Sequence, residues 1–233
     1  MSNWNEEAAA EWAAHGVFHS RTAKEEWDAG GVWLLGDRWP DGYPGKTSGF
    51  CYKSWCSRPE KKYLPGNYPI KDRVQEDQWE FVQVLDGCLE CVVQDEGRTK
   101  RFPLERSELV DIPPTLKRFW QFAEGEGTFA SGIAFFRELG APPVQPGAGE
   151  GYEFRLWDSG ELSRLERPMN LSSWAVRFVE VLTTEGILHA KVRTLSGEAR
   201  EYALSCRGHL FLRSDVAVTW QCRGNPSGIV VYL

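Results

Sequence analysis

The sequence predicts an all-β protein made of two small β-barrels in tandem, behind a short, partly helical N-terminal arm. Three observations predict it. Short strings recur in the same order in both halves of the chain, strand-like runs separated by turn residues fill the chain from about residue 49, and helix-forming segments are almost confined to about the first 30 residues. Regularly spaced short strands with turn signals are typical of sandwiches and barrels.

The internal repeat sets the domain organisation, because a missed repeat misassigns the whole fold. Four pairs of strings recur at offsets of 102, 97, 100 and 96 residues. They are Gly49–Ser57 with Gly151–Ser159, Phe81–Leu85 with Phe178–Leu182, Trp120-Gln121 with Trp220-Gln221, and Ser131–Ile133 with Ser227–Ile229. We therefore expect an arm over 1–48, a first barrel over 49–137, a linker over 138–150 and a degenerate second barrel over 151–233.

The arm contains the helical signals. Residues 4–14 favour a short helix by propensity, with Asn3 or Ser2 as its cap, and Thr22–Glu25 has the spacing of a capping box. A second short helix is expected from there toward Trp27, ended by Gly30-Gly31. A strand over 32–35 and a Pro- and Gly-rich loop over 37–46 complete the arm.

Strands dominate both units. In the first, 79–85 and 89–93 flank Asp86-Gly87, a dipeptide typical of tight β-hairpins. The segment 141–151, rich in Pro and Gly, has the composition of a linker and lies between the repeats. The strands expected in the second unit cover 175–182, 187–193, 201–204, 209–213, 217–222 and 228–233.

Composition narrows the class of protein. The 233 residues include 27 basic and 33 acidic side chains, a net charge of −6, so we expect no nucleic-acid partner. The sequence has no apolar run of about 18 residues, and its acidic start does not resemble a signal peptide. A cytoplasmic protein without a membrane partner is expected. Cys88 and Cys91 lie in a strand-like run, where residues three apart face opposite ways, and are expected to be buried thiols.

A known family emerges from three strings of the first unit: Leu64-Pro-Gly66, Glu80 separated by six residues from Gly87, and Val110–Thr115. Their order resembles the cupin superfamily, whose first motif carries a Glu and a Gly at this spacing and whose second motif carries a P-x-G turn. With the repeat, the resemblance implies a bicupin, two double-stranded β-helix barrels in one chain.

The metal-binding histidines of cupins are missing. The resemblance places them among residues 73–76 and at 118, which are Arg, Val, Gln, Glu and Arg here. A guanidinium cannot ligate a metal, so we expect neither a histidine-based metal site nor a cofactor. In the second unit Arg177 replaces Glu80 and Val218 stands opposite Arg118. This unit is expected to have lost pocket chemistry of its own.

The candidate site therefore lies in the first barrel. Strand alternation puts Glu80 on one face with Val82 and Val84, and Arg118 on one face with Trp120. Both faces point inward if the cupin geometry holds. We predict Glu80 and Arg118 as catalytic residues, and the predicted ligand-binding residues are Gln75, Glu76, Trp55 and Trp120. The competing interpretation is that Glu80 and Arg118 form a buried ion pair with no further role.

Three functions follow from this set. The first is binding of a small polar or anionic molecule in the first barrel, with metal-independent acid/base chemistry of the isomerase, lyase or cyclase type. The second is non-catalytic binding or sensing of a metabolite. The third is a metal-dependent oxygenase or isomerase that uses oxygen ligands from Gln75, Glu76 and Glu80. The expected partner is a small molecule, the two barrels are expected to pack with pseudo-two-fold symmetry, and homodimerisation is left open.

Overall fold

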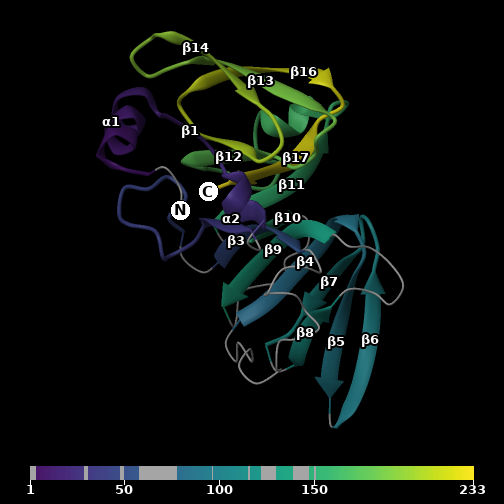
Figure 1. The fold of residues 1–233 in the computed structure, drawn as a ribbon. Coiled ribbons are helices and arrows are strands. Elements are labelled where there is room, and N and C mark those ends of the chain that lie inside the picture. The colour runs from purple at the N-terminus through teal and green to yellow at the C-terminus, as the bar shows by residue number, and fades with distance from the viewer. Residues whose placement is uncertain are drawn as a thin grey trace. The chain divides into compact units, whose positions relative to one another are not determined.

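The computed structural model describes residues 4–28, 31–47, 50–57, 78–95, 97–114, 116–121, 130–138, 147–149 and 151–233. The predictions for 64–66, Gln75 and Glu76 lie outside these residues. Antiparallel strands make up most of the described chain, and helices are short (Figure 1). None of the helices in these ranges has the length and apolar character needed to cross a bilayer.

The chain forms two compact units. One contains Ala23–Asp37 and Thr47–Ala141 and is called the first barrel; the other contains Met1–Thr22, Arg38–Lys46 and Pro142–Leu233 and is called the second barrel. The predicted arm thus contributes to both units. The sequence-based domain bounds stay a prediction.

The first barrel has two antiparallel sheets, ordered β2-β3-β9-β4-β7 and β6-β5-β8. Its elements are α2 (Lys24–Asp28), β2 (Val32–Leu35), β3 (Phe50–Ser57), β4 (Gln78–Gly87), β5 (Leu89–Asp95), β6 (Arg98–Leu104), β7 (Leu109–Ile112), β8 (Lys117–Gln121) and β9 (Ala130–Glu138).

The second barrel repeats this plan, with sheets ordered β1-β15-β12-β17-β11-β10 and β14-β13-β16. Its elements are α1 (Glu6–His15), β1 (Val17–Arg21), β10 (Gly147–Gly149), β11 (Tyr152–Asp158), the 3₁₀ helix η3 (Leu162–Leu165), β12 (Val176–Val181), β13 (Gly186–Arg193), β14 (Ala199–Leu204), β15 (Gly208–Arg213), β16 (Ala217–Gly224) and β17 (Ser227–Tyr232). The short strand β10 lies within the predicted linker.

Strand order and register confirm the duplication. The order β3-β9-β4-β7 corresponds to β11-β17-β12-β15, and β6-β5-β8 corresponds to β14-β13-β16. Trp55 pairs with Gly132 across β3 and β9, and Trp157 pairs with Gly228 across β11 and β17. Trp120, on β8, likewise has its counterpart on the equivalent strand β16. The repeated tryptophans therefore occupy equivalent strands, as the sequence predicts.

The two paired glycines explain part of the repeated sequence. A Cβ at Gly132 would lie 2.6 Å from Cζ2 of Trp55 and would clash with the carbonyl oxygen of Gln83. A Cβ at Gly228 would lie 2.9 Å from Cζ2 of Trp157 and would clash with the carbonyl oxygen of Glu180. In each barrel an indole ring lies over a glycine, so no side chain fits there.

Each barrel has its own apolar core, built from the inward-facing residues of its strands. In the first barrel this core includes Trp55, Val82, Val84, Leu89, Cys91, Val93, Leu104, Ile112, Ala130, Ala134 and Phe136. In the second it includes Val17, Trp157, Leu165, Val179, Val181, Leu188, Ala190, Val192, Leu204, Leu210, Leu212, Val216, Trp220, Val230 and Tyr232.

The hairpin predicted at Asp86-Gly87 is wrong. The chain does turn there, with Gly87 at φ 74°. However, β4 pairs with β7 and β9, whereas β5 pairs with β6 and β8. The dipeptide encodes only the local turn, and burial of both strands in one barrel requires the chain to pass from one sheet to the other.

The first helix begins later than predicted. Its cap is Asn5, whose Oδ1 accepts the backbone N–H of Ala8 at 2.8 Å, rather than Asn3 or Ser2. Gly16, at φ 69°, ends the helix in the left-handed conformation that glycine adopts easily. The chain then enters β1, which pairs with β15 of the second barrel.

Candidate functional site

Glu80 and Arg118 meet inside the first barrel. Glu80 lies on β4 opposite Ile112 and Phe136, and Arg118 lies on β8 opposite Val93. Nε of Arg118 donates to Oε2 of Glu80. Because β4 and β8 belong to different sheets, this ion pair joins the two sheets across the interior.

The pair is buried among apolar side chains. The side chains of Glu80 and Arg118 are 12% and 4% exposed. Nη1 of Arg118 lies 3.4 Å from the carbonyl oxygen of Leu116, as a long hydrogen bond. Among the described residues, Nη2 forms no hydrogen bond. The carboxylate thus holds the guanidinium through Nε, and Nη2 has no acceptor within the described part of the chain.

Cys91 lies within electrostatic reach of the pair. Its side chain is fully buried, and burial raises the pKa of its thiol to about 12. The Glu80 carboxylate raises this pKa further, whereas the Arg118 guanidinium lowers it. The thiol therefore stays protonated near neutral pH, which agrees with an inert buried cysteine rather than a nucleophile.

The structure describes two of the four predicted ligand-binding residues. Trp55 is 8% exposed and belongs to the core, and its Nε1 has no hydrogen-bond partner among the described residues. Trp120 is half-buried and packs against the same core. Gln75 and Glu76 lie outside the described residues, so the ligand roles of all four stay predictions.

Sequence reasoning missed Lys53 and Trp33. Lys53 lies on β3 between Cys51, which packs against the core, and the core residue Trp55, and all three share alternate positions. Its Nζ is 5.7 Å from the centre of the Trp33 ring. The Trp33 ring centre lies 5.0 Å from that of Phe136. The period-2 pattern that placed Glu80 on the inner face also places Lys53 there, so a signal was available.

The described residues offer no cluster of ligands for the hypothesis of a metal site built from Gln75, Glu76 and Glu80. No group of three or more His, Cys, Asp or Glu side chains that could hold a metal gathers within them. Of the three proposed ligands, the described chain includes Glu80 alone, and its Oε2 is bonded to Arg118. The hypothesis therefore rests on Gln75 and Glu76.

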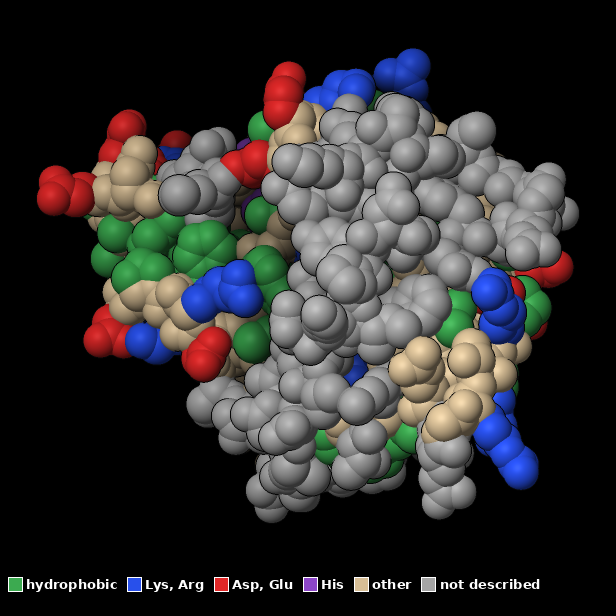
Figure 2. Space-filling view, turned by 60° about the horizontal axis from the view of Figure 1, so that its bottom comes forward, with side chains coloured by type: hydrophobic (Ala, Val, Ile, Leu, Met, Phe, Trp, Pro, Cys, Tyr) green, Lys and Arg blue, Asp and Glu red, His purple; other side chains and the backbone are tan. Residues whose placement is uncertain are grey.

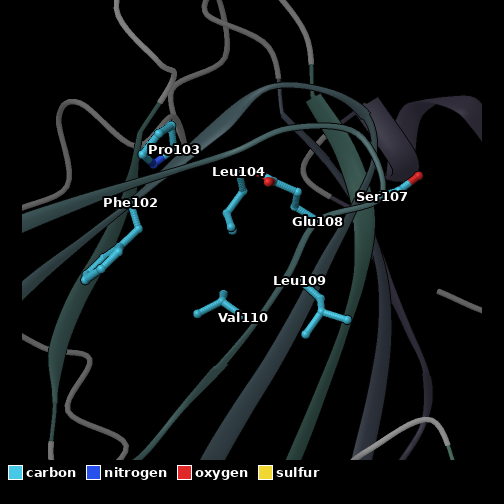
Figure 3. Close-up of a pocket in the computed structure, with 7 residues that line it drawn as sticks. All are labelled: Phe102, Pro103, Leu104, Ser107, Glu108, Leu109 and Val110. Atoms are coloured by element: carbon cyan, nitrogen blue, oxygen red, sulfur yellow. The ribbon is translucent and has the colours of Figure 1, made fainter.

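A separate groove of about 400 Å³ lies on the first barrel, along β6, the following turn and β7. Figure 3 shows the apolar side chains of Phe102, Leu104, Leu109 and Val110 around it. None of the predicted site residues lines this groove. Among the described side chains on the face drawn in Figure 2, acidic and basic groups lie near apolar ones.

Comparison with solved structures identifies the architecture. The vicilin of Corylus avellana (hazelnut) matches with a TM-score of 0.51 and 9% identity, over 94% of this chain and 85% of that chain. Oxalate decarboxylase of Bacillus subtilis matches with a TM-score of 0.45 and 9% identity, over 94% and 77%. A cupin 2 conserved barrel domain protein of Leptotrichia buccalis matches with a TM-score of 0.43 and 8% identity, over 91% of both chains.

The vicilin likeness confirms the predicted bicupin fold over most of the chain. No sequence model of a protein family matches this chain, and no curated protein sequence matches it. At 9% identity the likeness shows the fold alone. Any function must therefore be argued from the residues of the site.

Proposed function

We propose that this bicupin-fold protein binds a small anionic molecule in its first barrel, with Arg118 as the anchor and Glu80 as the residue that orients it. One observation carries the proposal: the buried guanidinium of Arg118 is held by Glu80 through Nε, while Nη2 has no hydrogen-bond partner among the described residues. An arginine fixed in this way loses little freedom when a carboxylate or phosphate oxygen accepts from it.

The surroundings of Arg118 support a small anionic ligand. Its guanidinium carries the donors from which a carboxylate or phosphate oxygen accepts, and Glu80 accepts from Nε. The half-buried Trp120 and the aromatic side chains around it supply the apolar wall that small-molecule sites usually have.

Binding fits the geometry better than acid/base catalysis by Glu80. A general base needs a carboxylate oxygen directed at the substrate proton, and Oε2 of Glu80 is bonded to Arg118. Proton transfer through this oxygen requires the ion pair to open. Non-catalytic binding or sensing of a metabolite is therefore the better-supported form of the proposal, and isomerase- or lyase-type chemistry is the second.

Calorimetric titration of the full chain with phosphate, oxalate and citrate tests the proposal. At least one of these anions should bind the wild type, and R118Q should weaken that binding at least about tenfold, since a charge-assisted hydrogen bond is lost. The matched control is R101Q, because Arg101 pairs with Glu90 and its side chain is 50% exposed.

Equal affinity in the wild type and a folded R118Q would overturn the proposal, as would an absence of binding to all three anions. E80Q adds a second comparison. If Glu80 only orients Arg118, E80Q should weaken binding less than R118Q does. The metal alternative is tested by elemental analysis of protein purified without added metal. A stoichiometric transition metal would favour it over the anion site.

A further inference from the structure

The interior of the second barrel carries charged side chains at one end. Arg155 on β11 and Arg177 on β12 alternate with the core residues Trp157 and Val179, so both lie on inward positions. Arg177 is 4% exposed, and the side chain of Arg155 is 12% exposed. By register, Arg177 occupies the place that Glu80 has in the first barrel, since each directly precedes the equivalent residue, Phe178 or Phe81.

Glu153 provides one negative charge, and its partners are known. This fully buried carboxylate accepts the backbone N–H of Met169 at 2.9 Å and that of Asn170 at 2.7 Å. Nε of Arg155 lies 2.9 Å from Oε1 of Glu153, although not in hydrogen-bonding geometry. Glu153 therefore compensates Arg155.

Arg177 has no such partner. Its Nη2 donates to the carbonyl oxygen of Glu166 at 2.5 Å, while its Nε and Nη1 are buried and form no hydrogen bond. No ion pair joins it to a carboxylate among the described residues. The guanidinium lies 4.9 Å from the Trp174 ring and 5.7 Å from the Tyr232 ring.

Tyr232 does not balance this charge. Its hydroxyl donates to the carbonyl oxygen of Arg164 at 2.8 Å, and burial raises its pKa to about 12, so the phenol is neutral near pH 7. The Glu166 carboxylate acts on the charge of Arg177 electrostatically, but no ion pair between the two is found among the described residues. A buried guanidinium without a directly bonded carboxylate is costly, and an anion is its natural counterpart.

A segment of the chain covers these groups through its backbone. Residues 161–174, here called the strap, include η3 and the coil that follows it. Strap carbonyl oxygens accept hydrogen bonds from Tyr232, Arg177 and Arg155. The two arginines therefore donate to neutral carbonyl oxygens. A carboxylate or phosphate oxygen in the same positions would form a stronger hydrogen bond with each guanidinium.

We propose that the second barrel contains an oxyanion site at Arg177, in which a carboxylate or phosphate group of a small molecule replaces the Glu166 carbonyl and the strap shifts to admit it. The planar guanidinium fixes the geometry: two oxygens of the anion bind Nη2 together with Nε or Nη1, both of which lack a hydrogen-bond partner. The site lies in the barrel that the sequence marks as degenerate, and it does not depend on the site proposed at Arg118.

The chain has 11 tryptophans, so the fluorescence of Trp174 is obtained as the difference between the wild type and W174F. This ring belongs to the strap and lies 4.9 Å from the Arg177 guanidinium. The experiment titrates the full chain with phosphate and with malonate at constant ionic strength, and follows tryptophan fluorescence and hydrogen exchange of the strap amides. We expect saturable binding by at least one anion and a changed exchange rate at Met169 and Asn170. R177Q should weaken this binding at least about tenfold.

Two variants separate this site from others. R118Q should leave the strap response unchanged, and so should R213Q, whose arginine pairs with Asp215 at 2.8 Å and has a 42% exposed side chain. If R177Q does not fold, R177K replaces it. It retains the charge but not the planar fork, and should bind the anion more weakly than the wild type. An equal response in the wild type and the Arg177 variant, or no response to either anion, would overturn the site and leave Arg177 as a packing residue between Trp174 and Tyr232.

Discussion

Removing one partner of the Glu80–Arg118 pair should destabilise the first barrel far more than removing both. In R118M the Glu80 side chain, 12% exposed, loses its counter-ion. Loss of one partner of a buried pair typically costs ~3–5 kcal/mol. Replacing both partners, as in E80L/R118M, leaves an apolar interior and should be nearly neutral or stabilising. The double-mutant cycle should therefore give a coupling energy of ~3 kcal/mol or more.

The assay is equilibrium urea denaturation of the full chain, with hydrogen exchange used to assign the transition of the first barrel. The pair of Lys191 and Glu201 provides the comparison, because both side chains are more than half exposed, at 53% and 73%, and such pairs contribute at most about 1 kcal/mol. A coupling energy for Glu80 and Arg118 no larger than that of the control pair would refute the reasoning that this ion pair is buried and joins the two sheets.

Three further predictions concern single residues. G132A and G228A should each lower the free energy of unfolding by at least ~2 kcal/mol in urea denaturation, because a Cβ would meet Trp55 at 2.6 Å or Trp157 at 2.9 Å. The control G160A should have a mild effect. A mild effect at all three positions would contradict the shared packing. Burial lowers the pKa of His209 to about 3, so below about pH 6.5 the unfolded chain gains a proton that the folded chain excludes. The free energy of unfolding should then fall by ~1.4 kcal/mol per pH unit from about pH 6.5 toward pH 3, and His209 should contribute nothing above that window. H209Q should reduce this slope of stability against pH. Equal slopes in both proteins would show that the folded state does not exclude protonation of His209. Cys91, with its pKa raised to about 12 by burial, should react with a thiol reagent at pH 8 only after denaturation, and mass spectrometry that finds it labelled in the native protein would contradict its burial.

The sequence predicted the architecture because the repeat preserves packing. Trp55 and Trp157 each require a glycine across the sheet, so these positions kept their identity in both halves. Strand alternation also predicted that Glu80 and Arg118 face one interior. The hairpin predicted between β4 and β5 at Asp86-Gly87 is wrong, because a turn dipeptide reports local backbone conformation and not which sheet receives the next strand.

The candidate sites were predicted less completely. Lys53 has the same alternation signal as Trp55, but it lies outside the motif positions of the resembled family. Arg177 was interpreted as a loss, since it replaces Glu80. Only the structure shows that two of its nitrogens are buried without a hydrogen-bond partner and that strap carbonyls stand against the arginines. These contacts come from the strap, and the alternation of residues along strands does not predict the backbone conformation of such a connecting segment.

The most direct test of the central proposal is a crystal structure of the full chain soaked in selenate, with the anion located by anomalous scattering. The account predicts a selenium peak inside the first barrel with a selenate oxygen at hydrogen-bonding distance, ~3 Å, from Nη2 of Arg118, while Nε stays bonded to Glu80. An interior without a peak, in which Nη2 donates to an acceptor of the protein itself, would contradict it.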